Sequence, residues 1–212
     1  MGARFGGEPE EVFMFSKRLA AALIAPAALA SLSGCGVNAI PTAEEEAKAA
    51  WANVQNQYQR RADLIPNLVE SVKGAAAQER NTLREVTEAR ARATQINLSP
   101  EQLRDPAAMR AFAEAQGRLS TAILPLRQLQ EAYPDLKTNQ NFLALQTQLE
   151  GTENRITIAR QDYNESVRRY NTTIRTFPNV IGAKVIYGAE PMVPFEATTP
   201  GANEAPKVSF GT

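Results

Sequence analysis

The chain has 212 residues, 23 basic and 23 acidic side chains, a formal net charge of zero, one cysteine and no histidine. Balanced charge gives no broad field that would attract nucleic acid, so we expect no nucleic-acid partner. Without histidine the chain lacks the commonest general base and metal ligand, which excludes Ser-His-Asp triads and Cys/His zinc sites. Composition therefore argues against an ordinary enzyme, and we expect no metal or cofactor, although a carboxylate-only site or a Ser-Lys pair stays open.

The N-terminal segment has the order of an export signal. Lys17 and Arg18 precede an apolar run, Leu19–Leu32, and small residues then lead to Cys35, as is typical of secretory signals. A membrane-spanning helix needs roughly 20 apolar residues, whereas this run has 14. A lipoprotein signal is therefore favoured over a transmembrane anchor. Acidic residues ahead of Met14 make that methionine a second candidate for the true start.

The tetrapeptide Leu32-Ser33-Gly34-Cys35 resembles the lipobox of bacterial lipoproteins. The resemblance implies that residues 1–34 are a removed signal peptide, that Cys35 is acylated, and that residues 35–42 are a lipidated tether. The protein would then be held at the cell envelope, facing the periplasm or the exterior. In a Gram-negative source, Gly36 would favour delivery to the outer membrane. The alternative is attachment through an N-terminal membrane helix.

The first helix predicted after this segment is long. Thr42 is its expected N-cap, and Glu44–Glu46 fall in its first turn, where acidic groups favour the helix dipole. Apolar residues then recur at steps of three and four to about Thr94, a helical period. Such a helix would reach roughly 75 Å, with a kink at Pro66 and a weak point at Gly74. We expect it to outreach its partners and to leave an unpaired end.

Two further helices follow a break at residues 97–106. The second begins after Ser99 or Asp105, because each precedes a proline as an N-cap does. It ends before Tyr133, and the third begins near Thr138 or Asn139 and stops at Phe177-Pro178. Their inner stripes are Met109, Phe112, Gln116, Leu119, Ile123, Leu126 and Leu129, and Phe142, Leu145, Leu149, Ile156, Tyr163, Val167, Tyr170 and Ile174.

The last part of the chain shows little regular hydrophobic periodicity. Residues 180–187 predict a short fourth helix across the bundle end or a strand-like segment, and residues 191–212, rich in Pro, Gly, Glu and Ala, predict a poorly ordered tail. No alternating pattern is long enough for a sheet. We therefore predict an all-α fold, in which residues 43–190 form long antiparallel helices packed like a four-helix bundle or coiled coil.

Four motifs occur in order between about Val54 and Pro178. They are residues 60–69 (RRADLIPNLV), 131–137 (EAYPDLK), 145–156 (LQTQLEGTENRI) and 160–171 (RQDYNESVRRYN). Together they resemble the LemA family of bacterial helical membrane-associated proteins. The resemblance implies an antiparallel helical bundle tethered near its N-terminus, with no established biochemical activity. Many members look as if they use a transmembrane helix, so the lipobox changes the anchor and not the bundle.

Polar side chains inside these motifs form the candidate site. Asp63 and Asn67 are four residues apart and share a helix face, as do Glu150 and Asn154. Inside a bundle such groups would satisfy one another and fix helix register, which we favour over a ligand-binding cleft. The candidates are Arg61, Asp63, Asn67, Glu150, Glu153, Asn154, Arg155, Arg160, Tyr163 and Asn164.

The leading functional hypothesis is a non-enzymatic, membrane-tethered bundle that binds other envelope proteins or itself. A carrier of lipid or small ligands is the alternative, and it needs an apolar internal cavity of a few hundred Å³. An enzyme that uses Asp63, Glu150 or Glu153 is the third hypothesis, and it needs two carboxylates close together in a dry cleft. We assign no catalytic residue, and Cys35 is the expected site of lipid attachment.

Overall fold

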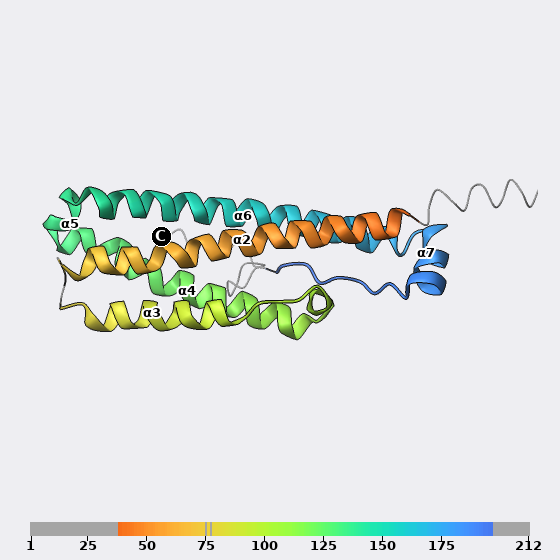
Figure 1. The fold of residues 1–212 in the computed structure, drawn as a ribbon, viewed down its shortest axis with the longest axis horizontal. Helices are drawn as coiled ribbons and strands as arrows, with labels where there is room; N and C mark the ends of the chain where they lie inside the picture. The colour runs from red at the N-terminus through yellow and green to blue at the C-terminus, as the bar shows by residue number, and fades with distance from the viewer. Residues whose placement is uncertain (1–37, 75, 77, 197–212) are drawn as a thin grey trace, which may run out of the picture.

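A computed structural model describes residues 38–74, 76 and 78–196, and this part of the chain is built from helices (Figure 1). The all-α fold with long antiparallel helices is confirmed. The expected signal peptide, Cys35 and residues 197–212 lie outside the described residues. The elements are α2 (Ala39–Lys73), α3 (Arg80–Gln95), the 3-10 helix η1 (Glu101–Arg104), α4 (Pro106–Ala132), α5 (Pro134–Thr138), α6 (Gln140–Thr173), α7 (Asn179–Gly182) and the π-helical turn η2 (Ala183–Tyr187).

The four long helices are packed in pairs. α2 lies along α6, α3 lies along α4, and α2 and α3 form an antiparallel hairpin (Figure 1). The short helix α5 connects α4 to α6 at one end of the bundle, and α7 lies at the other end. α4 and α6 make little direct contact with each other. The bundle is therefore closed on three sides and open between α4 and α6.

The prediction of one continuous helix to about Thr94 is wrong. α2 ends at Lys73, with Gly74 as its C-cap, and the chain reverses into α3. Glycine disfavours a helix by about 1 kcal/mol relative to alanine, and the reversal lets the apolar face of α3 contribute to the core. Leu83 and Val86 are buried there. Because α2 is paired along its length with α6, it does not have the protruding end that we expected.

α2 also begins earlier than predicted. Its N-cap position is Asn38 and not Thr42, whose hydroxyl donates a hydrogen bond to the Asn38 carbonyl oxygen at 2.8 Å. Pro41 is compatible with this start because N–H groups in the first turn have no acceptor inside the helix. Glu44–Glu46 consequently lie beyond the first turn, where the helix dipole has less effect on them.

The starts of the other two long helices agree with the sequence. Asp105 caps α4 and Asn139 caps α6, each by accepting hydrogen bonds from backbone N–H groups of the first turn. Ser99 precedes only the short helix η1. α2 and α4 continue through Pro66 and Pro125 without ending there.

The core has two parts with different chemistry. At the α7 end, Trp51 packs against Phe112 and Tyr163 with ring centroids 5.2 and 5.1 Å apart, distances typical of aromatic pairs. At the α5 end the core is mostly aliphatic. The predicted stripes of α4 and α6 are buried, except that Leu145 is partly buried.

Helices α7 and η2 confirm the helical alternative for residues 180–187. They pass across the bundle end, and the chain then turns at Gly188, whose φ of +54° is a left-handed conformation that glycine adopts easily. Residues 189–196, here called the strap, run back along the bundle in an extended form (Figure 1).

The strap corrects the prediction of a poorly ordered tail from residue 191. Met192 and Phe195 are 2% and 5% exposed and belong to the aromatic part of the core. Composition alone indicated disorder, whereas these two side chains complete a core formed by residues far away in the sequence. The correction applies to residues 191–196, because the rest of the predicted tail is not described.

Candidate functional site

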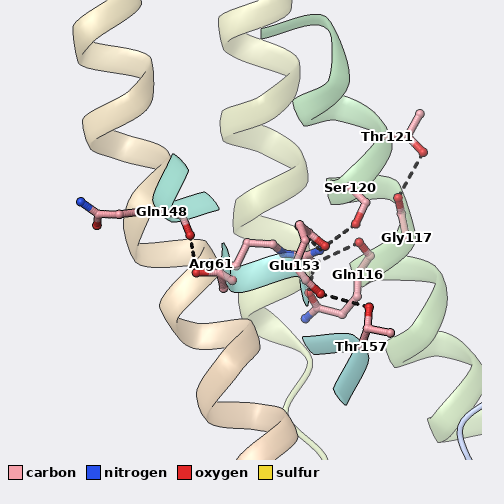
Figure 2. A network of polar contacts seen from close by, with 9 residues as sticks. Arg61, Gln116, Gly117, Ser120, Thr121, Gln148, Glu153 and Thr157 are labelled. Atoms are coloured by element: carbon pink, nitrogen blue, oxygen red, sulfur yellow. Dashed lines mark hydrogen bonds and ion pairs between the residues drawn. The ribbon is translucent and has the colours of Figure 1, made fainter. Parts of the chain in front are cut away.

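Arg61 is at the centre of a polar network inside the bundle (Figure 2). The residue is 1% exposed. Its Nη1 donates to Ser120 Oγ at 2.7 Å and lies 3.1 Å from Glu153 Oε1. Its Nη2 donates to Gln116 twice, to the side-chain Oε1 at 2.6 Å and to the carbonyl oxygen at 3.1 Å. One guanidinium on α2 therefore binds groups on both α4 and α6.

The network extends to α3. Gln116 Nε2 donates to the carbonyl oxygen of Ala93 at 3.1 Å. Arg90 of α3 donates from Nε to the carbonyl oxygen of Ala62, the residue after Arg61, at 2.7 Å. Sliding one helix along its neighbours would leave buried groups without partners, at about 1–3 kcal/mol each. This geometry joins all four long helices and is suited to fixing their register.

Because Arg61 is buried, its guanidinium needs hydrogen-bond and charge partners inside the bundle. A buried charge is costly unless it is paired and hydrogen-bonded, and the Glu153 side chain that pairs with it is 35% exposed. The guanidinium carbon also lies 5.0 Å from the centre of the Tyr58 ring, a cation–π contact. Burial raises the pKa of Tyr58. Its phenol is therefore neutral at physiological pH.

Half of the predicted candidates lie on the solvent face. These exposed candidates are Asp63, Asn67, Glu150, Asn154 and Arg155. The two i, i+4 pairs do share a helix face, but that face is turned to water and not to the bundle interior. Asp63 accepts a hydrogen bond from Gln59 at 2.7 Å, and Glu150 pairs with Arg127 at 2.8 Å. These carboxylates and Glu153 have separate partners, and the structure does not gather them in a dry cleft.

Two members of the Arg61 network were missed in the sequence. Gln116 stands in the inner stripe of α4 among apolar residues, and a polar side chain at such a position usually has buried partners. That was the available signal. Ser120, four residues further along α4, gave none, since serine occurs as readily on solvent faces.

The remaining candidates hold the strap. Asn164 donates from Nδ2 to the Phe195 carbonyl oxygen at 2.9 Å and accepts at Oδ1 from the Phe195 N–H at 2.6 Å. The Tyr163 hydroxyl donates to the Val193 carbonyl oxygen at 2.9 Å. The Arg160 guanidinium lies 4.2 Å from the centre of the Phe195 ring. The side-chain amide thus binds both backbone groups of one residue, as a neighbouring β-strand would.

The same arrangement recurs two turns later on α6. Asn171 donates to the Met192 carbonyl oxygen at 2.8 Å and accepts from the Met192 N–H at 2.9 Å. The Tyr170 hydroxyl donates to the Glu190 carbonyl oxygen at 3.1 Å. The repeated Tyr-Asn pair, seven residues apart, was the signal that sequence reasoning did not use. Asn164 and Asn171 are called the Asn clamp below.

The tyrosines of this site are kept neutral. Burial raises the pKa of Tyr163 well above its usual range and also raises the pKa of Tyr170. Both phenols can therefore serve as hydrogen-bond donors to the strap. Loss of either proton would place an anion against a backbone carbonyl oxygen, which is unfavourable.

The open side of the bundle is called the α4–α6 seam. The strap fills its half nearest α7, and the seam continues past Phe195 as a groove of about 510 Å³. Arg61, Arg118, Thr121 and Thr157 are among the residues that line this open half. Its charged and hydroxyl side chains differ from the apolar cavity that a lipid carrier requires.

Among residues 38–74, 76 and 78–196, no helix combines the length and apolar character that crossing a membrane requires. Within the same ranges, no three or more carboxylate, cysteine or histidine side chains are grouped so that they could hold a metal ion.

The fold is an antiparallel helical bundle, and the Arg61 network of hydrogen bonds connects its four long helices. The model of the LemA family matches residues 50–210. The chain belongs to the LemA family, and the resemblance carried by the four sequence motifs is confirmed.

Individual relatives are more distant. The magnetosome protein MamQ of Magnetospirillum gryphiswaldense is 28% identical over 157 residues, an alignment that covers 66% of this chain and 58% of the relative. Magnetosome proteins MamQ 1 and MamQ 2 of Paramagnetospirillum magneticum are each 27% identical with the same coverage. The chain thus spans little more than half the length of the curated relatives it matches.

Proposed function

We propose that this protein is a non-enzymatic, membrane-tethered helical bundle of the bacterial cell envelope, and that it binds an extended segment of a protein partner in the open half of the α4–α6 seam. The strap is the observation that carries the proposal. In one half of the seam the bundle holds an extended segment of its own chain, while the other half, with a volume of about 510 Å³, holds none of the described residues.

The contacts of the strap suggest how a partner is bound. The Asn clamp binds the N–H and carbonyl groups of Phe195 and Met192, so the bundle holds the strap through backbone groups that any sequence presents. Side chains that enter the core then add selectivity. Recognition of extended peptides by added strands divides affinity and selectivity in the same way.

The open half favours a partner segment that carries polar or charged side chains. Arg118 and Thr121 on α4 face this groove together with Glu153 and Thr157 on α6. Both signs of charge are present, and hydroxyl groups can donate to or accept from a peptide backbone. A segment that continues in the direction of the strap would find these groups along its path.

Tethering would confine such binding to the membrane surface. If Cys35 is acylated, each buried methylene adds about 0.8 kcal/mol to membrane attachment, and more than one acyl chain makes attachment stable. A transmembrane segment would have the same effect. The bundle would then collect its partner at the envelope surface, which is the role of a scaffold. The lack of histidine in the chain and the separate partners of its candidate carboxylates support a role without catalysis.

Site-specific photocrosslinking in intact cells tests the proposal. A photoreactive residue is placed at Thr157, which lines the open half of the seam, or at Ile158, which is 50% exposed and outside that lining. We expect a defined crosslinked product from position 157 and none from position 158. Mass spectrometry of the product tells a second copy from another protein. Equal products from the two positions, or none from either, would contradict the proposal.

A further inference from the structure

The bundle end formed by α7 and η2 exposes a concentrated apolar surface. Its five large side chains are between 43% and 79% exposed, whereas the other large apolar side chains that are exposed in residues 38–196 as described, Leu124, Leu143 and Ile158, are spread over α4 and α6. A contiguous exposed patch indicates an interaction surface, while single exposed residues need no explanation. The patch, here called the end patch, consists of Phe177, Ile181, Val185, Ile186 and Tyr187.

Within the segment that carries the end patch the charged side chains are basic, and the exposed Glu190 follows three residues after its last member, Tyr187. Residues 175–187 contain Arg175 and Lys184 and no acidic residue, and both basic side chains are exposed. Aliphatic and aromatic side chains bordered by basic ones are typical of segments that lie in the interface of a membrane. The long side chain of Lys184 can keep its charge among lipid headgroups while its stem contacts the apolar region.

The chain enters the bundle at this same end. Asn38, the first described residue, directly precedes α2, whose start lies at the same end of the bundle as α7 (Figure 1), and Ile40 shares a core cluster with Ala183 of η2. Cys35 is three residues before Asn38, so an extended chain places them no more than about 11 Å apart. Even the end of the apolar run Leu19–Leu32 is within about 22 Å of Asn38. Either form of anchor therefore brings the end patch to the bilayer.

We infer that the end patch inserts into the interface of a lipid bilayer, so that the bundle stands on the membrane with its α7 end down. The inference rests on the tether of the proposed function but concerns a different surface and a different partner from the α4–α6 seam. The tether keeps the bundle close to the membrane, and the apolar and basic side chains of the end patch orient the bundle on it. The open seam is then held at a defined angle to the membrane.

Quenching of tryptophan fluorescence by brominated lipid tests this placement. Full-length protein with its anchor is reconstituted into vesicles of phosphatidylcholine and phosphatidylglycerol, with or without bromine on the acyl chains. Val185→Trp reports on the end patch. Leu143→Trp is the matched control, since Leu143 is exposed near the start of α6, close to the opposite end of the bundle. Wild type gives the background, because its single Trp51 is 3% exposed.

We expect bromine to quench the added tryptophan of Val185→Trp at least about twofold more than that of Leu143→Trp, which should match background. Flotation of the vesicles is measured on the same samples. Protein that floats but shows equal quenching in the two variants overturns the inference and leaves the tether intact. If a second copy covers the patch, floating protein again shows no added quenching. Protein that does not float contradicts both the tether and the inference.

Discussion

Two acidic side chains of α6 each pair with an arginine, and the two pairs differ in burial. Glu153 pairs with the buried Arg61, and Glu150 pairs with the more exposed Arg127. Glu153→Ala removes the charge partner of a guanidinium that is 1% exposed. We expect it to lower the free energy of unfolding by about 1–2 kcal/mol, since Ser120 and Gln116 still bind the guanidinium while the charge is no longer neutralised. Urea denaturation at neutral pH measures the loss.

Glu150→Ala is the matched control for this prediction. Its pair with Arg127 is more exposed, with side chains 52% and 30% accessible, and surface pairs contribute about 0–1 kcal/mol. We expect a change of about 0.5 kcal/mol or less. Equal losses for the two variants would show that the Arg61 network does not depend on its carboxylate.

The buried phenol of Tyr163 should make the free energy of unfolding depend on pH in the alkaline range. Burial raises the pKa of its phenol in the folded state above the unfolded value of about 10. Folding therefore favours the neutral form, and its contribution is complete below about pH 10 and is lost as pH rises above that value. Tyr163→Phe should lose less stability than wild type between about pH 9 and about pH 11. Urea denaturation across this range measures the difference, and parallel curves would contradict it.

At the level of elements, the starts of α4 and α6 could be predicted from the sequence, whereas those of α2 and α3 could not. Asp105 and Asn139 were each one of two candidates in the sequence, because a side-chain cap acts on its own backbone neighbours, and the structure selects between the two. The hairpin at Gly74 could not be predicted, since helical periodicity continues on both sides of it and does not distinguish one long helix from two. The strap depends on contacts between Phe195 and distant residues such as Trp51, which composition does not reveal.

The strap gives a prediction for backbone exchange. Asn164→Ala removes the acceptor of the Phe195 N–H and the donor to its carbonyl oxygen. We expect hydrogen exchange at the Phe195 amide to become at least about tenfold faster, because each lost bond costs about 1 kcal/mol or more. Exchange measured by NMR at the Met192 amide, which Asn171 holds, should change less.

Asn154→Ala is the control on the same helix. Asn154 is exposed, and we expect exchange in the strap to be the same as in wild type. If Asn164→Ala left the Phe195 amide as protected as before, the Asn clamp would not be what holds the strap.

At the scale of the whole molecule, three surfaces are separated along the bundle. The end patch lies at the end where the described chain begins, the strap occupies the adjoining half of the α4–α6 seam, and the open half follows beyond Phe195. Sequence motifs located α6 as the helix that supplies most of the site. They could not show which polar residues face inward, because that depends on how α2 and α6 rotate against each other. Asp63 and Arg61 illustrate this. They are only two residues apart, yet Asp63 is exposed to solvent and Arg61 is buried in the core.

The central claim is that the open half of the seam binds a protein partner, and an affinity pull-down with variants of the seam tests it most directly. Thr157→Trp fills the groove, and Ile158→Trp adds the same bulk to a neighbouring position outside its lining. Membranes are solubilised in detergent and recovered proteins are quantified against wild type, with Cys35→Ser as a measure of dependence on the anchor. The account predicts a partner that is retained with Ile158→Trp and lost at least about tenfold with Thr157→Trp, a difference of about 1.4 kcal/mol. Equal recovery of every partner with the two tryptophan variants would contradict it.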